Sequence, residues 1–246
     1  MITKQVPVVD VDDPHTWPDN LADRVHGLLD LVRDTVDGPE FPCADLPLAE
    51  HEDSTSRLLD GCLLRAYHAT RLLPHEADAI RSQGLRILDE RLVTDRLDAA
   101  HRHGHLTDIE HRALLEGRTL SGNRVNKVLL FLSAASFTHD ARGLRPLLTN
   151  WGGEGIYWQH IHHDNPLRTK LRSFGTPTIV VATLDLTAAD KVLVFPGVTH
   201  ALVGTALGLS TIGGSVHYYA PIPPAHIERL IQPGDPDYPH TALPQT

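Results

Sequence analysis

Two polar side chains at alternate positions of one apolar stretch are the first candidates for chemistry in this sequence. His68 and Thr70 lie within residues 64–71, which read Leu-Arg-Ala-Tyr-His-Ala-Thr-Arg. Side chains alternate across a β-strand with a period of two, so a strand here would direct both groups to the same face. The alternative is a buried strand whose histidine and threonine only satisfy local hydrogen bonds. These eight residues alone leave both interpretations open.

The residues that follow predict a short helix and a turn. Pro74 suits the first turn of a helix, and Gly84 suits its C-terminal stop. Ile80 and Leu85 are available to pack this helix against the rest of the protein. We therefore treat Gly84-Leu85-Arg86 as the second half of the motif that begins at His68.

A second distinctive stretch covers residues 150–158 and reads Asn-Trp-Gly-Gly-Glu-Gly-Ile-Tyr-Trp. Its three glycines let the backbone approach a ligand closely or adopt positive φ angles. A flat ligand can stack on Tyr157 or Trp158, where the chain enters a strand or a helix. The alternative is a glycine turn followed by aromatic core residues, and the pattern alone favours that alternative.

Composition limits the classes of function. The chain has 246 residues, 41% of them hydrophobic, which suffices for a substantial core. A formal net charge of -9 argues against a protein that holds nucleic acid mainly through phosphate contacts. Cys43 and Cys62 are too few for a four-thiolate metal site or a disulfide framework, so we expect a reducing cytoplasm. We expect no signal peptide and no membrane association, because no apolar run approaches ~18 residues.

The regions that must position the two motifs are predicted from hydrophobic periodicity. Residues 1–60 are expected to form an accessory extension with one amphipathic helix over 21–32, capped by Asp19. A polar insert is expected to form two helices, over 89–103 and from a capping box at Thr107 to Gly117, exposed as a surface hairpin. A further helix is expected over 141–148, a loop or short helix over 201–214, and a disordered tail over 235–246. Strands are predicted at 128–132, 178–184, 191–195 and 215–219, and residues 222–231 are predicted to form a Pro-broken turn into a final strand.

The order of these motifs resembles a known family. His68-x-Thr70, a short helix, Gly84-Leu85-Arg86 and then Gly153-x-Gly155-Ile156-Tyr157 look like the NAD-binding half of the ADP-ribosyltransferase fold. The resemblance is closest to the branch of poly(ADP-ribose) polymerases and diphtheria-type toxins, whose signature is His, Tyr and Glu on three successive strands. It implies an α+β fold, a split β-sandwich with the nicotinamide end of NAD in a cleft between its sheets, over residues 61–234.

The resemblance also implies roles for individual residues. His68 should hydrogen-bond the adenosine-side ribose, and Thr70 should steady the motif. Backbone near His68 and Ala69 should grip the nicotinamide amide, and Tyr157 should stack on the nicotinamide ring. Gly84 and Gly155 belong to the same binding segments.

The third signature residue departs from the family pattern. The closing pattern Ile222-Pro223-Pro224 places Ser215 where the family has its glutamate, or His217 if the register slips by two. Neither is a carboxylate, so neither supplies the negative charge that stabilises an oxocarbenium-like transition state. Glu154 and Glu228 are the nearby carboxylates that can substitute, and Glu154 is preferred because it lies inside the second motif.

Other constellations are less specific. His160-x-His162-His163-Asp164 contains metal-capable residues, but its spacing matches no defined zinc pattern, and we expect an exposed polar turn and no metal. Gly213-Gly214-Ser215-Val216-His217 lacks the second glycine of a nucleophile elbow. Neither a phosphate-binding loop with Gly-Lys-Ser/Thr nor a Gly-x-Gly-x-x-Gly after a strand is present in the sequence.

Three functions follow as hypotheses. The first is an NAD-dependent mono-ADP-ribosyltransferase or NAD glycohydrolase, of toxin or defence type, with NAD as substrate, an unknown acceptor and a cognate immunity or antitoxin partner. The second is a catalytically weak or inactive module of the same fold that binds NAD or ADP-ribose. The third is an RNA 2'-phosphotransferase-like enzyme, disfavoured by the acidic net charge. Acceptor choice is expected to lie in residues 201–214 and in the helical insert.

Overall fold

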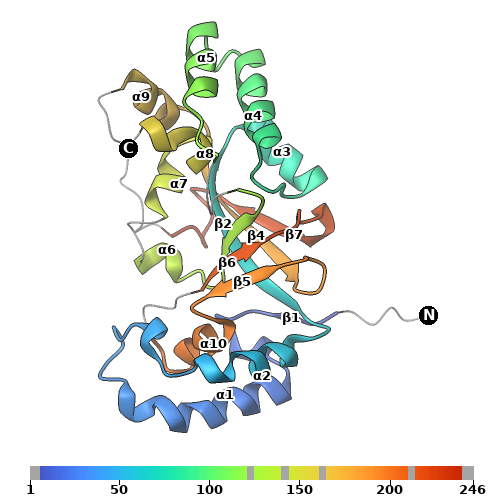
Figure 1. Ribbon diagram of the computed structural model, residues 1–246, viewed down its shortest axis with the longest axis vertical. Helices are drawn as coiled ribbons and strands as arrows, with labels where there is room; N and C mark the ends of the chain where they lie inside the picture. The colour runs from blue at the N-terminus through green and yellow to red at the C-terminus, as the bar shows by residue number, and fades with distance from the viewer. Residues whose placement is uncertain (1–5, 121–124, 140–143, 161–164, 210–213, 240–246) are drawn as a thin grey trace, which may run out of the picture. The chain divides into compact units, whose positions relative to one another are not determined.

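The structure is a computed structural model that describes residues 6–120, 125–139, 144–160, 165–209 and 214–239. The chain is an α+β protein, as predicted. Its sheet has the strand order β5-β6-β3-β2-β4-β7, and β1 pairs with β2 off this path (Figure 1). The strands are β1 (Val8–Val9), β2 (Leu63–Leu72), β3 (Val128–Phe131), β4 (Thr176–Asp185), β5 (Val192–Phe195), β6 (Ser215–Tyr218) and β7 (Ile227–Ile231). β1 runs parallel to β2, whereas β2 with β3 and β5 with β6 are antiparallel.

In chain order, every α-helix of the described residues lies between two strands. They are α1 (Asp19–Val32), α2 (Glu52–Ser56), α3 (Pro74–Gln83), α4 (Glu90–Arg102), α5 (Asp108–Glu116), α6 (Ser136–His139), α7 (Arg145–Thr149), α8 (Glu154–Tyr157), α9 (Pro166–Ser173) and α10 (Val198–Ala206). Single 3-10 turns connect several of them. The four strands predicted with bounds are confirmed, each within two residues of those bounds, and the final strand is β7 within residues 222–231.

Contacts divide the chain into two compact units. Unit 1 combines Met1–His68 with Leu129–Asp140 and Val181–Tyr218, and unit 2 combines Ala69–Val128 with Ala141–Val180 and Tyr219–Thr246. The strands β2, β3 and β4 contribute residues to both units. These units are defined by contacts between residues and do not follow the order of the chain. The expected domain boundaries at residues 60 and 234 stay a prediction.

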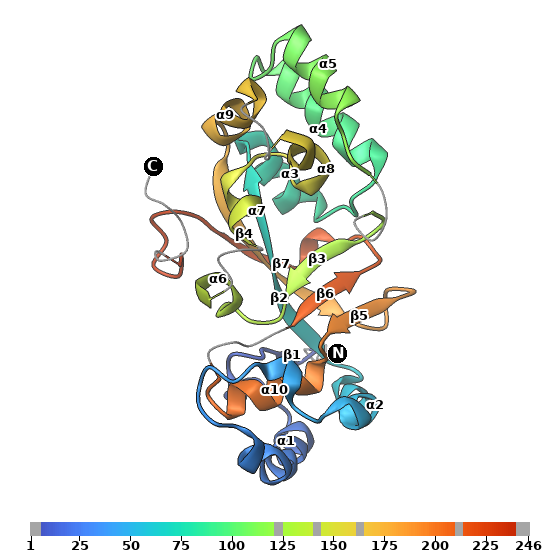
Figure 2. The same cartoon turned by 60° about the vertical axis from the view of Figure 1, so that its left-hand side comes forward.

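In unit 1 the N-terminal helix is part of the core. α1 buries Leu21, Val25 and Leu28 and packs with α10, as Figures 1 and 2 both show. The helix is confirmed, but its expected cap is wrong. Asp19 is the first helical residue, and Pro18 precedes it with no side-chain hydrogen bond to the helix.

A carboxylate fixes the start of α10. The oxygens of Glu52 accept hydrogen bonds from the backbone N–H groups of Val198 and Thr199 at 2.6 and 3.0 Å. These N–H groups have no partner within the helix, so an outside acceptor is needed. Residues 201–214 were expected to form a loop or a short helix, and residues 201–206 are helical. Residues 210–213 lie outside the described residues.

In unit 2 the polar insert carries a buried face. α4 and α5 lie side by side (Figure 1). Val93, Leu97 and Leu114 are fully buried in one hydrophobic cluster with Trp151 and Tyr157. The expected hairpin of two helices is observed, but its expected solvation is wrong, because Val93, Leu97 and Ala100, three or four positions apart on α4, form an apolar stripe that joins the core. The capping box of Thr107 with Glu110 is confirmed.

Two other expectations concern segments that lie partly outside the described residues. The helix predicted over 141–148 is observed as α7 from Arg145, and residues 140–143 lie outside the described residues. The expected disorder is wrong for residues 235–239, because Tyr238 is buried and Asp237 pairs with Arg229 at 2.5 Å. The rest of that segment, residues 240–246, lies outside the described part.

A buried ion pair links α3, α4 and the glycine-rich segment of unit 2. One oxygen of Glu76 accepts from Arg96 Nε at 2.6 Å, and the other accepts from Leu73 N and Trp151 Nε1, each at 2.7 Å. The Arg96 guanidinium lies 5.2 Å from the centre of the Trp151 ring. Burial raises the pKa of Glu76, but the charge of Arg96 and the three hydrogen bonds outweigh it and hold that pKa below its ordinary value.

We expect Glu76→Gln to lower the free energy of unfolding at pH 7 by about 3 kcal/mol, because it leaves Arg96 buried without its counter-charge. A lowered folded-state pKa contributes stability above the unfolded value of 4.5, and this is lost as pH falls through the folded value. The difference between wild type and variant should therefore shrink below pH 4.5. Urea denaturation from pH 7 to pH 3 measures it.

Glu90→Gln is the matched control, since Glu90 pairs with Arg118 but its side chain is 70% exposed. Exposed pairs contribute at most about 1 kcal/mol. A loss in Glu76→Gln no larger than in this control would contradict the role assigned to the buried pair.

Candidate functional site

The first predicted motif lies on β2, where alternation controls the direction of each side chain. His68 is half-buried and Thr70 is 5% exposed, and both face the same side of the strand. Ala69 between them is 1% exposed and faces the other side. The strand and the shared face of His68 and Thr70 are confirmed.

The imidazole of His68 is held in one orientation. Its Nδ1 lies 2.7 Å from the carbonyl oxygen of Leu129 on the neighbouring strand β3. A carbonyl only accepts hydrogen bonds, so Nδ1 carries the hydrogen in the neutral ring and Nε2 carries the lone pair. In the neutral ring His68 Nε2 can therefore accept a hydrogen bond.

The helix α3 and its C-terminal glycine follow as predicted. Pro74 occupies the first turn, and Gly84 ends the helix with its N–H bonded to Ile80 O at 2.9 Å. Leu85 then exchanges two backbone hydrogen bonds with Ile222, at 2.9 and 2.8 Å. This pairing holds the Gly84-Leu85 segment against the chain just before Pro223.

Gly84 is required at this contact for two separate reasons. Its φ of 84° lies in the left-handed region. A Cβ on Gly84 would also lie 1.9 Å from the carbonyl oxygen of Ile222, which is far inside van der Waals contact.

The second motif forms a turn and a short helix. Gly152 and Gly153 have φ angles of 101° and 70°, and α8 begins at Glu154. The family signature places its tyrosine on a strand, whereas Tyr157 is the last residue of α8. Its ring is 1% exposed within the hydrophobic cluster of unit 2, so in this structure its faces are covered by protein. Its assignment as the nicotinamide-stacking residue stays a prediction. Trp158 is more exposed.

Gly155 and Glu154 of this motif both interact with other parts of the protein. Gly155 is buried, and its carbonyl accepts a hydrogen bond from Thr119 N at 2.9 Å. Glu154 is half-buried, and its charge acts on Lys127, whose side chain is buried. Burial lowers the pKa of Lys127, and the carboxylate of Glu154 partly offsets that effect.

Ser215 and His217 face away from His68. Tyr67 is paired with Phe131, so His68 lies opposite Leu130. The N–H of Leu132 bonds to Gly214 O at 2.8 Å, so these two residues share a face of the sheet. Side chains two residues apart on a strand point the same way, and Leu130 and Val216 therefore share that face. Leu130 and Val216 are fully buried, whereas Ser215 and His217 are half-buried on the opposite face.

The face that carries Ser215 and His217 is partly aromatic. Phe195 of β5 is paired with Ser215, and its ring lies 5.4 Å from that of His217. Figure 2 shows β5 and β6 side by side. The structure therefore does not bring either predicted replacement for the family glutamate onto the His68 side of the sheet.

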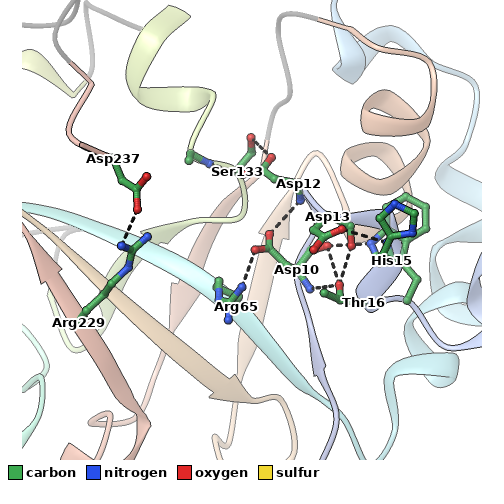
Figure 3. Close-up of polar contacts among 11 residues, drawn as sticks. Asp10, Asp12, Asp13, His15, Thr16, Arg65, Ser133, Arg229 and Asp237 are labelled. Atoms are coloured by element: carbon green, nitrogen blue, oxygen red, sulfur yellow. Dashed lines mark hydrogen bonds and ion pairs between the residues drawn. The ribbon is translucent and has the colours of Figure 1, made fainter. Parts of the chain in front are cut away.

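An acidic segment that no sequence motif singled out anchors β1 and the start of β2. The carboxylate of Asp10 pairs with Arg65 at 2.7 Å, and Asp12 accepts hydrogen bonds from Ser133 Oγ at 2.5 Å and Ala134 N at 2.7 Å (Figure 3). Burial raises the pKa of Asp12, although these hydrogen bonds act against it. All of these contacts are internal, so the segment is structural. Only the spacing Asp-x-Asp-Asp signalled it.

The histidine-rich stretch after α8 is only partly described. His160 is buried, and its Nδ1 lies 3.1 Å from Asn165 Nδ2. Residues 161–164 lie outside the described residues. Within the described ranges, no group of three or more His, Cys, Asp or Glu side chains is placed to hold a metal ion.

Comparisons with known proteins add no assignment. Neither a family model, nor a curated protein, nor a solved structure matches the chain. In the part of the chain that the structure describes, no helix has the length and apolar character needed to cross a membrane.

We expect Gly84→Ala to destabilise the protein much more than Gly104→Ala. Both glycines have positive φ, but a Cβ on Gly104 meets nothing within 4 Å. The control should therefore lose only the backbone strain of about 1 kcal/mol. Gly84→Ala should lose roughly 2 kcal/mol more, because Ile222 must move. Urea denaturation compares the two, and equal losses would show that the contact with Ile222 adapts freely.

Proposed function

We propose that this chain is an NAD-dependent mono-ADP-ribosyltransferase or NAD glycohydrolase with a split β-sandwich of the ADP-ribosyltransferase type. The observation that carries the proposal is the fixed imidazole of His68, whose Nε2 is an acceptor because Nδ1 donates to Leu129 O. A ribose hydroxyl can donate its hydrogen to such an acceptor. Thr70 shares the face of His68 and is buried, which suits a residue that steadies the segment.

The proposed reaction breaks the bond between the nicotinamide nitrogen and C1' of the ribose. The bonding electron pair leaves with nicotinamide, and C1' gains the positive charge of an oxocarbenium-like state. An acceptor oxygen or nitrogen, or water, then attacks C1' and loses a proton. A carboxylate near C1' lowers the barrier by stabilising the positive charge.

We assign that carboxylate to Glu154. It begins α8 directly after the two glycines with positive φ, and it is half-buried. Backbone near Ala69 grips the nicotinamide amide in this proposal, and Gly155 and Tyr157 complete the segment. Stacking by Tyr157 requires the hydrophobic cluster to open, since its ring is covered.

A second candidate is a non-catalytic module that binds NAD or ADP-ribose. The observation that favours it is the position of Ser215 and His217, which share a face with Phe131 rather than with His68. Without a carboxylate on the His68 side, the same segment can hold the ribose and leave the glycosidic bond intact.

The acceptor stays undefined in this proposal, as does an immunity or antitoxin partner. Residues 201–204 were expected to help choose the acceptor, but they are buried within α10 and cannot contact one in this structure. The helical insert was also expected to help choose the acceptor, and in this proposal the exposed faces of α4 and α5 contact it.

We expect the purified full chain to release nicotinamide from NAD, and we expect His68→Ala to slow release by about 100-fold by loss of a transition-state hydrogen bond. Glu154→Gln should reduce release similarly while NAD binding persists, because it removes charge and keeps shape. Ser215→Ala should change release little. Chromatography of nicotinamide and calorimetric titration with NAD measure the two properties on the same samples.

His26→Ala is the control, since His26 is an exposed histidine on α1. NAD binding that depends on His68 without any nicotinamide release would select the binding module over the transferase. Absence of both binding and release would refute the proposal.

A further inference from the structure

Three arginines of unit 2 form a cluster of like charge, which we call the arginine cluster: Arg145, Arg168 and Arg172. Arg168 and Arg172 are four residues apart on α9, so they lie on one face of that helix. Arg145 is the first residue of α7. Arg145 and Arg172 are exposed, and Arg168 is half-buried.

Two ties hold α9 beside α7. The side-chain oxygen of Asn150 accepts from Arg172 Nε at 3.4 Å, and its side-chain nitrogen donates to Pro146 O at 2.9 Å. The next residue, Trp151, donates its backbone N–H to Leu171 O at 2.8 Å. The Arg172 guanidinium is therefore kept near the first turn of α7, where Arg145 lies.

The arginine cluster is electrostatically unsatisfied within the described residues. None of its three members forms an ion pair there, although the chain has 31 acidic residues against 22 basic ones. Lys170 on the same helix does pair, with Glu110 at 3.5 Å. Burial lowers the pKa of Arg172, and the charges of Arg168 and Arg145 lower it further.

One nitrogen of the cluster is also left without a hydrogen-bond partner. Arg168 Nε is buried, and no acceptor reaches it among the described residues. A buried donor without an acceptor is unfavourable, as are like charges one turn apart on a helix. An anion placed between the guanidinium groups would relieve the repulsion between the like charges.

The arginine cluster lies on the side of β2 opposite to the side chain of Thr70. Arg71 follows Thr70, so its side chain takes the opposite face. Its Nε donates to Phe174 O at 2.9 Å and its Nη1 to Leu148 O at 3.3 Å, at the ends of α9 and α7. The elements that carry the arginine cluster are therefore packed on the Arg71 face.

We propose that the arginine cluster, which lies on the opposite side of β2 from Thr70, binds a phosphate group. Planar guanidinium groups match phosphate oxygens in pairs of parallel hydrogen bonds. The ligand is inorganic phosphate or a phosphate monoester on a small molecule. This inference does not rest on the NAD reaction, because binding at the cluster can be measured without any turnover.

The test is calorimetric titration of the full chain with inorganic phosphate and, separately, with adenosine monophosphate, at low salt. Arg168→Gln and Arg172→Gln should each weaken phosphate binding by at least about 10-fold, since each removes a charge-assisted contact. Arg145→Gln, at an exposed position, should weaken it in the same direction. Arg112→Gln on α5 is the matched control, because it removes one exposed arginine of the same unit.

Arg172→Lys separates charge from geometry. Lysine keeps the charge but lacks the planar fork, so it should restore only part of the affinity. Tighter binding of adenosine monophosphate than of phosphate would identify a nucleotide ligand, and equal binding would identify free phosphate. Both results support the site.

Three results would overturn the proposal. One is no phosphate binding up to about 10 mM, which is weaker than a specific site requires. Another is equal loss of affinity in Arg112→Gln and in the cluster variants. The third is displacement of phosphate by saturating NAD, because that would place both ligands in one site. Thermal denaturation of each variant confirms that it remains folded.

Discussion

The alternation of side chains along β2 is the constraint on which the rest of the structure depends. This strand has ten residues, and each step of one reverses the face. It directs His68 and Thr70 to one side, and it directs Arg71 to the ends of α7 and α9 on the other. A shift of one residue in its pairing would exchange these two sets. The pair of Arg65 with Asp10, and the register of Tyr67 with Phe131, hold it in place.

Unit 2 contains a buried charge with all of its partners and a group of charges without an ion pair among the described residues. Glu76 is almost completely buried, and both of its oxygens are used by Arg96, Leu73 and Trp151. The arginine cluster, in contrast, combines three positive charges with no ion pair in the described ranges. A satisfied network stabilises a fold, whereas the arginine cluster has positive charges that the phosphate group of our proposal would balance. This contrast separates a structural element from a candidate binding site within one unit.

The catalytic question reduces to the location of one negative charge. The carbonyl of Leu129 fixes the neutral His68 ring in the tautomer with Nε2 as acceptor, which our proposal uses for a ribose hydroxyl. The two positions expected to replace the family glutamate lie on the other face of the sheet. Glu154 is a carboxylate in the second motif, but it begins a helix and acts on Lys127. In this proposal, cleavage of NAD requires a carboxylate near the ribose, whereas binding of NAD does not.

Local signals in the sequence were sufficient for most elements. Pro74 and Gly84 marked the ends of α3, Thr107 and Glu110 the start of α5, and apolar runs the strands, because these depend on neighbours within a few residues. What depends on distant residues was decided only by the tertiary structure. The insert became core because Trp151 and Tyr157 cover Leu97 and Leu114, and Ser215 faced away because the pairing with β3 set its side. The arginine cluster likewise required α7 and α9 to meet, and no local pattern encodes a contact between segments more than twenty residues apart.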